Sequence, residues 1–220
     1  MQVGAGNAWR GLVHVALVAG LLAGCADGED EAPASTSASA DAAGGNGSGD
    51  VARSGGTIGA EGSACELPVT FDIAEDWAAE SVDAAAGGAA EELADALLRQ
   101  GPVTAACEVD AKPAGNIGFL RVWTGEPGDD DARTVLEAFV AAEDGVSKEK
   151  YSSFEAGGLT GAEVEYLCTS ELLEETKKER ALAVTTPDGP VVLHLGGMDT
   201  EEHEAMLPAY ELAKRTLHGS

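Results

Sequence analysis

Ile117-Gly118-Phe119-Leu120-Arg121-Val122-Trp123-Thr124-Gly125-Glu126 is the stretch that decides the fold class. Its large apolar residues, Phe119, Leu120, Val122 and Trp123, occupy both of the alternating positions of a strand. A strand that is apolar on both faces must be covered on both faces. The stretch therefore predicts a central strand in a layered α/β domain.

Turn residues place this stretch in a hairpin. Residues 112–116, Lys-Pro-Ala-Gly-Asn, separate it from the largely apolar residues 103–111. Because Pro, Gly and Asn favour turns, the two segments are predicted to pair as antiparallel neighbours. Upstream, residues 69–73 alternate apolar and polar side chains, and residues 78–83 follow after a short break. Two further strands are predicted there.

The last third of the chain is predicted to form a meander of three strands. These strands are residues 161–169, 181–186 and 191–195. Pro187-Asp188-Gly189-Pro190, which separates the last two, is typical of a tight hairpin turn. Residues 170–179 allow either one helical turn or a wide polar loop, and we favour the loop.

Three helices are predicted from apolar residues at helical spacing. The apolar positions are Leu93, Ala96 and Leu97 in the first, Val135, Leu136, Phe139 and Val140 in the second, and Met206, Tyr210, Ala213 and Leu217 in the third. Asp199, with Glu202 three residues later, forms a capping box at the start of the third helix. Pro208 is expected to kink or restart that helix.

The predicted order of elements is strand, strand, helix, hairpin, helix, three-stranded meander and helix. It contains no strand–helix–strand repeat of the kind that builds parallel sheets. We therefore predict an α+β fold, in which helices flank an antiparallel sheet.

The beginning of the chain has the pattern of an export signal. Arg10 provides a positive charge, and the mostly apolar residues 12–24 are too few to span a membrane, which takes about 20 residues. Leu22-Ala23-Gly24-Cys25 resembles a bacterial lipobox, in which a peptidase cuts before the cysteine and the thiol carries diacylglycerol. We predict a signal peptide over residues 1–24 and a lipid anchor at Cys25, on the outer face of the cell membrane.

Residues 25–63 are predicted to be a flexible linker, and residues 64–220 one folded domain. After Cys25 the linker is nearly all Ala, Gly, Ser, Thr, Asp and Glu, with Val51 and Ile58 isolated. Such a segment buries too little apolar surface to offset the entropy lost on ordering. The residues that follow are enough for one domain with a complete core.

The chain carries a formal net charge of −26 at pH 7. This charge excludes nucleic acid as a partner, because a polyanion repels phosphate and no basic stripe is present. It also opposes close contact between the domain and anionic lipid headgroups. The acyl chains on Cys25 are therefore expected to hold the protein at the lipid bilayer.

The order of elements resembles a known family. An opening strand followed by Trp77, a helix after Trp123, a Pro-Asp-Gly hairpin and a terminal amphipathic helix are similar to the PsbP-like α/β/α fold of actinobacterial LpqN-type lipoproteins. The resemblance covers roughly residues 65–218. It implies a small extracytoplasmic accessory or interaction domain, and it brings no catalytic residues.

Three cysteines, Cys65, Cys107 and Cys168, lie in the predicted domain. In an oxidising compartment, this odd number predicts one disulfide and one thiol. Position favours a bond between Cys65 and Cys107, although the sequence also permits the other two pairings. Cys168 shares a predicted strand face with Val164 and Tyr166, so we expect a small buried core residue.

We expect neither an enzyme nor a cofactor, because the sequence contains no strong catalytic or nucleotide-binding motif. Cys168 and His194 lie on predicted strands that are separated by a third strand, which puts them about 10 Å apart. A nucleophile–base dyad needs about 3 Å. His194 is therefore expected to pack or to hydrogen-bond at the sheet.

His194, Asp199 and His203 form a candidate metal site, since three such ligands and a water can hold zinc. Simpler roles are favoured for two of them, with Asp199 as a helix cap and His203 as an exposed helical residue. Asp129-Asp130-Asp131 lacks the ligand pattern of a calcium-binding EF-hand and is interpreted as the start of a helix.

Two functions remain open. The favoured one is a membrane-anchored, non-enzymatic interaction or accessory domain that contacts another envelope protein. The alternative is a ligand- or metal-binding envelope sensor, which would need a lined pocket between the sheet and a helix.

Overall fold

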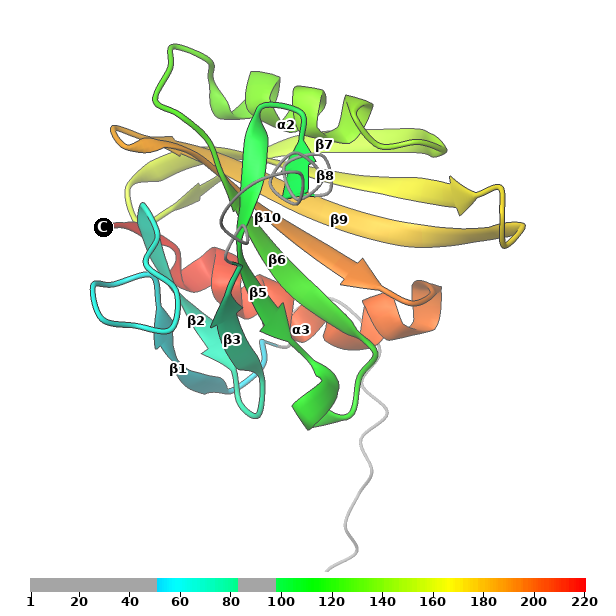
Figure 1. Cartoon of the computed structure of the whole chain (residues 1–220), viewed down its shortest axis with the longest axis horizontal. Helices are drawn as coiled ribbons and strands as arrows, with labels where there is room; N and C mark the ends of the chain where they lie inside the picture. The colour runs from blue at the N-terminus through cyan, green and yellow to red at the C-terminus, as the bar shows by residue number, and fades with distance from the viewer. Residues whose placement is uncertain (1–50, 83–97) are drawn as a thin grey trace, which may run out of the picture. The chain divides into compact units, whose positions relative to one another are not determined.

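The structure is a computed structural model that describes residues 51–82 and 98–220. Its largest element is an eight-stranded sheet in the order β3-β5-β6-β10-β9-β8-β7, with β4 paired to β5 (Figure 1). All of its strand pairs are antiparallel, as predicted. The strands are β3 (Ala78–Ser81), β4 (Arg99–Gln100), β5 (Val103–Asp110), β6 (Gly118–Thr124), β7 (Val146–Ala156), β8 (Leu159–Ser170), β9 (Glu175–Thr186) and β10 (Gly189–Gly197).

Strand β6 lies between β5 and β10, which confirms the predicted central strand. Leu120 and Val122 are buried in a core that includes residues of α3 (Thr200–Thr216). Trp123 points to the other face, into a core that includes residues of α2 (Ala132–Ala141). The two helices thus cover opposite faces of the sheet, here called the α2 side and the α3 side (Figure 1).

Both helices begin at an aspartate cap. Asp131 Oδ1 accepts a hydrogen bond from the backbone N–H of Thr134 at 2.8 Å, and Asp199 Oδ1 accepts one from Glu202 at 2.9 Å. Each cap satisfies an N–H that has no partner inside its helix. The core positions predicted for the two helices are buried. The α3 helix continues without a break through Pro208, so the chain does not restart there.

A second, three-stranded sheet packs beside the α3 side and corrects the predicted linker boundary. It has the order β1-β2-β11, with β1 at Ser54–Ile58, β2 at Val69–Ala74 and β11 at His218–Gly219. Because β1 pairs with β2, the interpretation of residues 25–63 as linker is wrong at its C-terminal end. The composition of this segment indicated too little apolar burial for an ordered strand. The Gly-rich strand β1 is instead stabilised by pairing of its backbone with β2. Ile58 adds a buried side chain.

Other predictions in the meander need correction. Strand β7 is missing from the sequence-based prediction, because its side chains are mostly polar and exposed. The loop favoured over residues 170–179 is also wrong for most of its length, since β8 runs to Ser170 and β9 begins at Glu175. Charged side chains occupy both sides of this end of the hairpin, so no apolar alternation reveals the strand.

Two predicted elements lie partly or wholly outside the described residues. The strand predicted over 78–83 is observed as β3, which ends at Ser81. The helix predicted from Leu93, Ala96 and Leu97 lies outside the described residues. None of the helices in the described part of the chain is both long enough and apolar enough to cross a membrane.

Candidate functional site

Five side chains form a continuous polar chain on the α2 side of the sheet. Lys177 Nζ lies 2.7 Å from Glu179 Oε1, and Glu179 Oε2 lies 3.1 Å from His194 Nε2. The same His194 nitrogen lies 3.2 Å from the hydroxyl oxygen of Tyr166. This hydroxyl donates to Glu143 Oε2 at 2.7 Å. We call these five residues the polar chain.

Strand register brings the polar chain together. Tyr166 on β8 lies opposite Glu179 on β9, and His194 on β10 lies opposite Ala181, two residues further along β9. Residues two apart on a strand share a face, so Lys177, Glu179 and Ala181 all point to the α2 side. Tyr166 and His194 are therefore the cross-strand neighbours of Glu179.

The middle of the polar chain is buried and internally satisfied. The Glu179 side chain is 2% exposed and that of His194 is 12% exposed. Because a carboxylate only accepts hydrogen bonds, the His194 Nε2 that faces Glu179 carries the proton. Burial alone would raise the pKa of Glu179, but the hydrogen bond and charge of His194, together with Lys177, outweigh burial and lower that pKa. Burial and the charge of Glu143 raise the pKa of Tyr166, so its hydroxyl stays protonated and donates.

Cys168 lies beside the polar chain but is not paired with His194. Strand β9 separates their strands, and Cys168 lies opposite Lys177 whereas His194 lies opposite Ala181. The expectation that Cys168 is a small buried core residue is correct only in part, since Cys168 is partly buried and packs against the α2-side core. Burial, followed by the hydrogen bond and charge of Glu143, raises the pKa of the Cys168 thiol to about 12. The thiolate is therefore scarce near neutral pH.

The three candidate metal ligands do not come together. His194 belongs to the polar chain, Asp199 caps α3, and His203 is buried on the first turns of α3 with 2% exposure. The expectation that His203 is exposed is therefore wrong, because its position faces the sheet. Burial lowers the pKa of His203 to about 4. Among the described residues, no group of three His, Cys, Asp or Glu side chains is placed to hold a metal ion.

Cys65 and Cys107 form the predicted disulfide, with their Cα atoms 5.9 Å apart. Cys65 precedes β2, and Cys107 lies on β5. Both are buried in the α3-side core. The bond therefore links the small sheet to the large one.

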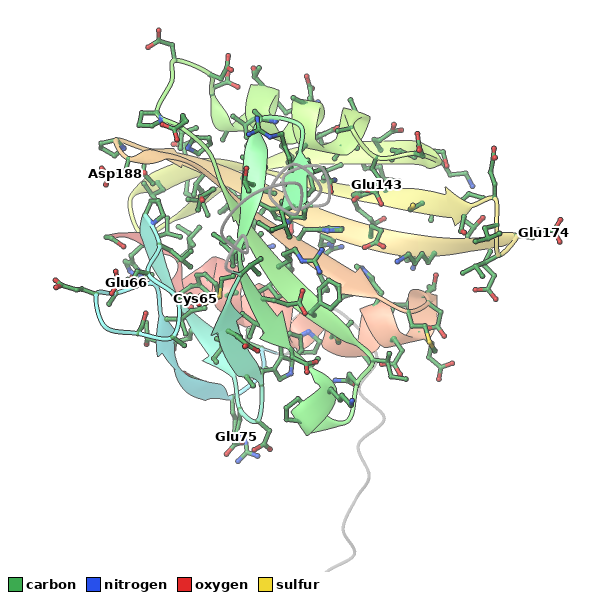
Figure 2. All side chains as sticks on the ribbon, viewed as in Figure 1. Cys65, Glu66, Glu75, Glu143, Glu174 and Asp188 are labelled. Carbon is green, nitrogen blue, oxygen red and sulfur yellow. A yellow bond between two sulfur atoms is a disulfide. The ribbon has the colours of Figure 1, made fainter. Side chains whose placement is uncertain are left out.

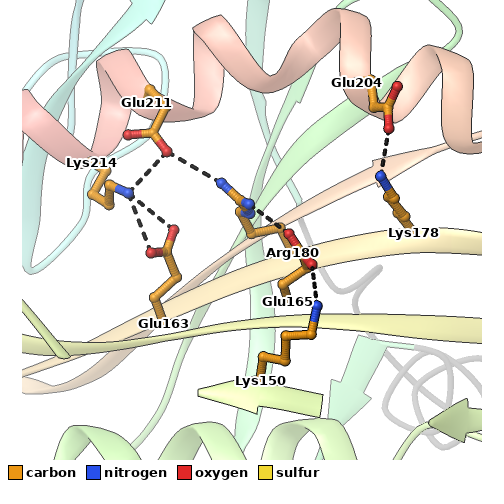
Figure 3. A network of polar contacts seen from close by, with 8 residues as sticks. All are labelled: Lys150, Glu163, Glu165, Lys178, Arg180, Glu204, Glu211 and Lys214. Carbon is orange, nitrogen blue, oxygen red and sulfur yellow. Dashed lines mark hydrogen bonds and ion pairs between the residues drawn. The ribbon is translucent and has the colours of Figure 1, made fainter. Parts of the chain in front are cut away.

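A second polar network connects α3 to the sheet (Figure 3). Arg180 on β9 lies 2.9 Å from Glu165 on β8 and 3.3 Å from Glu211 on α3. Lys214 on α3 lies 2.9 Å from Glu211 and 3.1 Å from Glu163 on β8. All five side chains are partly exposed. We call them the rim network.

Four large apolar side chains are exposed in the described part of the chain, and all four lie at one end of the large sheet. Their exposed fractions are 56% for Ile117, 59% for Met198, 91% for Leu172 and 66% for Leu173. At this end β6 begins, β10 ends and the turn between β8 and β9 lies. We call these four residues the apolar end. Sequence periodicity did not identify it, since isolated apolar residues in turns carry no period.

Two members of the apolar end border a hollow in the surface. The Met198 N–H donates to the Ile117 carbonyl oxygen at 3.1 Å. Both residues, with Phe119 and the glycines of neighbouring strands, line a hollow of about 490 Å³. Asp110 and Lys112 also line this hollow. It is a predominantly apolar site with charged groups at its border.

Comparison with known proteins places the chain in a family. A family model described as an uncharacterised lipoprotein matches residues 34–217. The chain belongs to this lipoprotein family. No curated protein matches the lipoprotein significantly in sequence. A solved structure that it resembles is the solution structure of cyanobacterial PsbP (CyanoP) from Synechocystis sp. PCC 6803, with a TM-score of 0.46 and 13% identity over 75% of this chain and 98% of that chain.

Proposed function

We propose that this lipoprotein is a non-enzymatic interaction domain, held at the outer face of the cell membrane by diacylglycerol on Cys25. Membership of a lipoprotein family and the lipobox at residues 22–25 support the anchor. The small polar residues that follow Cys25 suit a spacer between the bilayer and the folded domain. The order of strands and helices, with the opening strand before Trp77, supports an actinobacterial LpqN-type lipoprotein.

The apolar end carries the proposed interaction role. The chain has a net charge of −26, yet its large exposed apolar side chains, among the described residues, lie at one end of one sheet. Single exposed apolar residues are ordinary, but a localised group beside a hollow is typical of a binding surface. The apolar end is therefore the surface through which the domain contacts an envelope protein.

The chemistry of the α2 side supports a structural role for the groups that most resemble catalytic ones. Glu179 and Tyr166 hydrogen-bond to His194, and Cys168, which is not paired with His194, has a pKa of about 12. A thiol of that pKa is a poor nucleophile near pH 7, because little of it is thiolate. These groups hold the sheet together and leave binding to the apolar end.

The anchor and the interaction are tested in the same cells. Cys25→Ala should move the protein from the membrane fraction to the soluble extracytoplasmic fraction, because the acyl chains are lost. Immunoblotting of the fractions measures this. Unchanged membrane retention in that variant would contradict the lipid anchor.

For the interaction, a photo-crosslinking amino acid at position 198 should give a discrete protein adduct. The same amino acid in place of Asp188, at the opposite end of the sheet, is the matched control. Adduct yields at positions 198 and 172 that are no higher than at position 188 would contradict binding through the apolar end.

A further inference from the structure

The hairpin of β8 and β9 extends beyond the rest of the large sheet at the apolar end (Figure 1). Pairing between β9 and β10 reaches only as far as Arg180, whereas β9 continues to Glu175 and pairs with β8 up to Ser170. Leu172 and Leu173 lie in the connecting turn and are 91% and 66% exposed. Figure 2 shows the neighbouring Glu174 at the tip, pointing away from the domain. We call residues 171–174 the hairpin tip.

The residues of the hairpin tip are not those that a turn requires. In the two other hairpins of the meander, glycine takes the left-handed backbone conformation, at Gly157 and Gly158 in one and at Gly189 in the other. In the hairpin tip, the residue with positive φ is Glu174, at 55°. Glycine or asparagine would adopt this conformation at lower cost. The turn geometry therefore does not account for a glutamate at position 174.

The hairpin tip is also acidic. Glu171, Glu174 and the adjoining Glu175 are exposed around the two leucines. The nearest lysines along β9 are already engaged, with Lys177 bound to Glu179 and Lys178 bound to Glu204. The tip thus presents an apolar pair flanked in sequence by three exposed glutamates.

The negative charge of the hairpin tip limits the kinds of surface to which the tip can bind. Anionic headgroups repel three carboxylates, and a second copy of a chain with net charge −26 repels them as well. A protein surface with a small apolar pocket and Lys or Arg at its border is complementary to the tip, because the pocket suits the two leucines and the basic groups suit the glutamates. Leu172 and Leu173 lie in the turn of a hairpin that extends beyond β10, so they are placed to contact such a pocket.

We propose that the hairpin tip docks into an apolar pocket with a basic border on another envelope protein. Leu172 and Leu173 fill the pocket, and Glu171, Glu174 and Glu175 pair with the basic groups at its border. This inference rests on the proposed interaction function and assigns it a contact segment and a partner chemistry.

The test uses the full-length lipoprotein in its own cells, with a photo-crosslinking amino acid at position 172. Position 188, in the turn at the opposite end of the sheet, is the matched control. We expect a protein adduct at position 172 that is at least about tenfold stronger than at position 188, because hot-spot contacts cluster at a few residues. The crosslinked peptide, sequenced by mass spectrometry, should contain Lys or Arg residues.

Charge reversal gives the second measurement. Glu171→Lys with Glu174→Lys should reduce the adduct at position 172 by about tenfold, because like charges across an interface oppose binding. Asp188→Lys changes charge at the other hairpin and should leave the adduct unchanged. Equal circular dichroism spectra of the variants exclude unfolding as the cause.

The outcomes separate this inference from the proposed function. An adduct at position 198 but none at position 172 overturns the hairpin-tip contact and leaves the interaction function standing. No adduct at either position overturns both. A lipid adduct at position 172, or a protein adduct that survives charge reversal, also overturns the inference, since the contact would then be with the membrane or independent of charge.

Discussion

The two faces of the large sheet bury polar groups in different ways. On the α2 side, the polar chain passes through the interior, where Glu179 is 2% exposed. On the α3 side, the interior is largely apolar and contains the disulfide, while the rim network, drawn in Figure 3, consists of partly exposed side chains. Water weakens ion pairs at a rim, whereas an interior polar group depends on its partners. Stability should therefore respond to polar substitutions mainly on the α2 side and to apolar or covalent changes on the α3 side.

The largest expected effect is on the α3 side, at the disulfide. Cys65 and Cys107 are 42 residues apart in sequence, and a loop of that size is expected to contribute about 4 kcal/mol to the free energy of unfolding. Cys65→Ser and Cys107→Ser should each lose this amount, and the double variant should lose no more. Guanidinium unfolding measures the three values. Additive losses would show that the two cysteines do not act through one bond.

Matched substitutions of two glutamates test the polar comparison directly. Glu179→Ala removes the partner of both Lys177 and His194 in the interior and should cost about 3 kcal/mol. Glu165→Ala removes a partner of Arg180 at the rim, where the Glu165 side chain is 37% exposed, and should cost less than about 1 kcal/mol. Urea unfolding at pH 7 compares them. Equal losses would erase the distinction between the two faces.

His203 is an exception on the α3 side, because it is a buried ionisable group. Burial lowers its pKa from 6.5 to about 4, so between these values the unfolded chain binds a proton that the folded chain does not. The free energy of unfolding should therefore fall as the pH drops from about 6.5 to about 4, by up to about 3 kcal/mol. In the His203→Leu variant, the free energy of unfolding should depend less on pH between about 6.5 and about 4.

The matched control for His203 is His218, which is exposed. The His218→Gln variant should show the same change in the free energy of unfolding between pH 6.5 and pH 4 as the unchanged protein. A stability curve with the same slope in the His203→Leu variant would contradict the burial argument. Thermal unfolding at several pH values gives the slopes.

The last comparison is between two buried tyrosines, one on each side of the sheet, and Tyr210 has the smallest expected effect. The Tyr166 hydroxyl contacts Glu143 and His194, so Tyr166→Phe should cost about 1–2 kcal/mol. The buried Tyr210 hydroxyl has no hydrogen-bond partner among residues 51–82 and 98–220. Tyr210→Phe should therefore change stability by less than about 0.5 kcal/mol, or raise it. A larger loss for Tyr210→Phe than for Tyr166→Phe would reverse the comparison.

Prediction from the sequence succeeded where the spacing of apolar side chains indicates which face of an element is buried. The apolar residues on both faces of β6 indicated a central strand, and the spacing of Val135, Leu136 and Phe139 indicated α2. It failed for β1, β7 and the first residues of β9, where the strands are polar or rich in glycine. Such strands are stabilised by backbone pairing with a neighbour, and the neighbour cannot be recognised from the strand itself.

From the sequence by itself came the resemblance of residues 22–25 to a lipobox, the antiparallel α+β class and the favoured cysteine pair, because these depend on local pattern, on the order of elements and on parity. The tertiary structure decided the polar chain, the burial of His203, the separation of the three candidate metal ligands and the position of the apolar end. Tyr166, Glu179 and His194 lie on three different strands, so their contact depends on strand register. Register is set by pairing between segments far apart in the sequence, and the exposure of a side chain is known only when those segments have been placed.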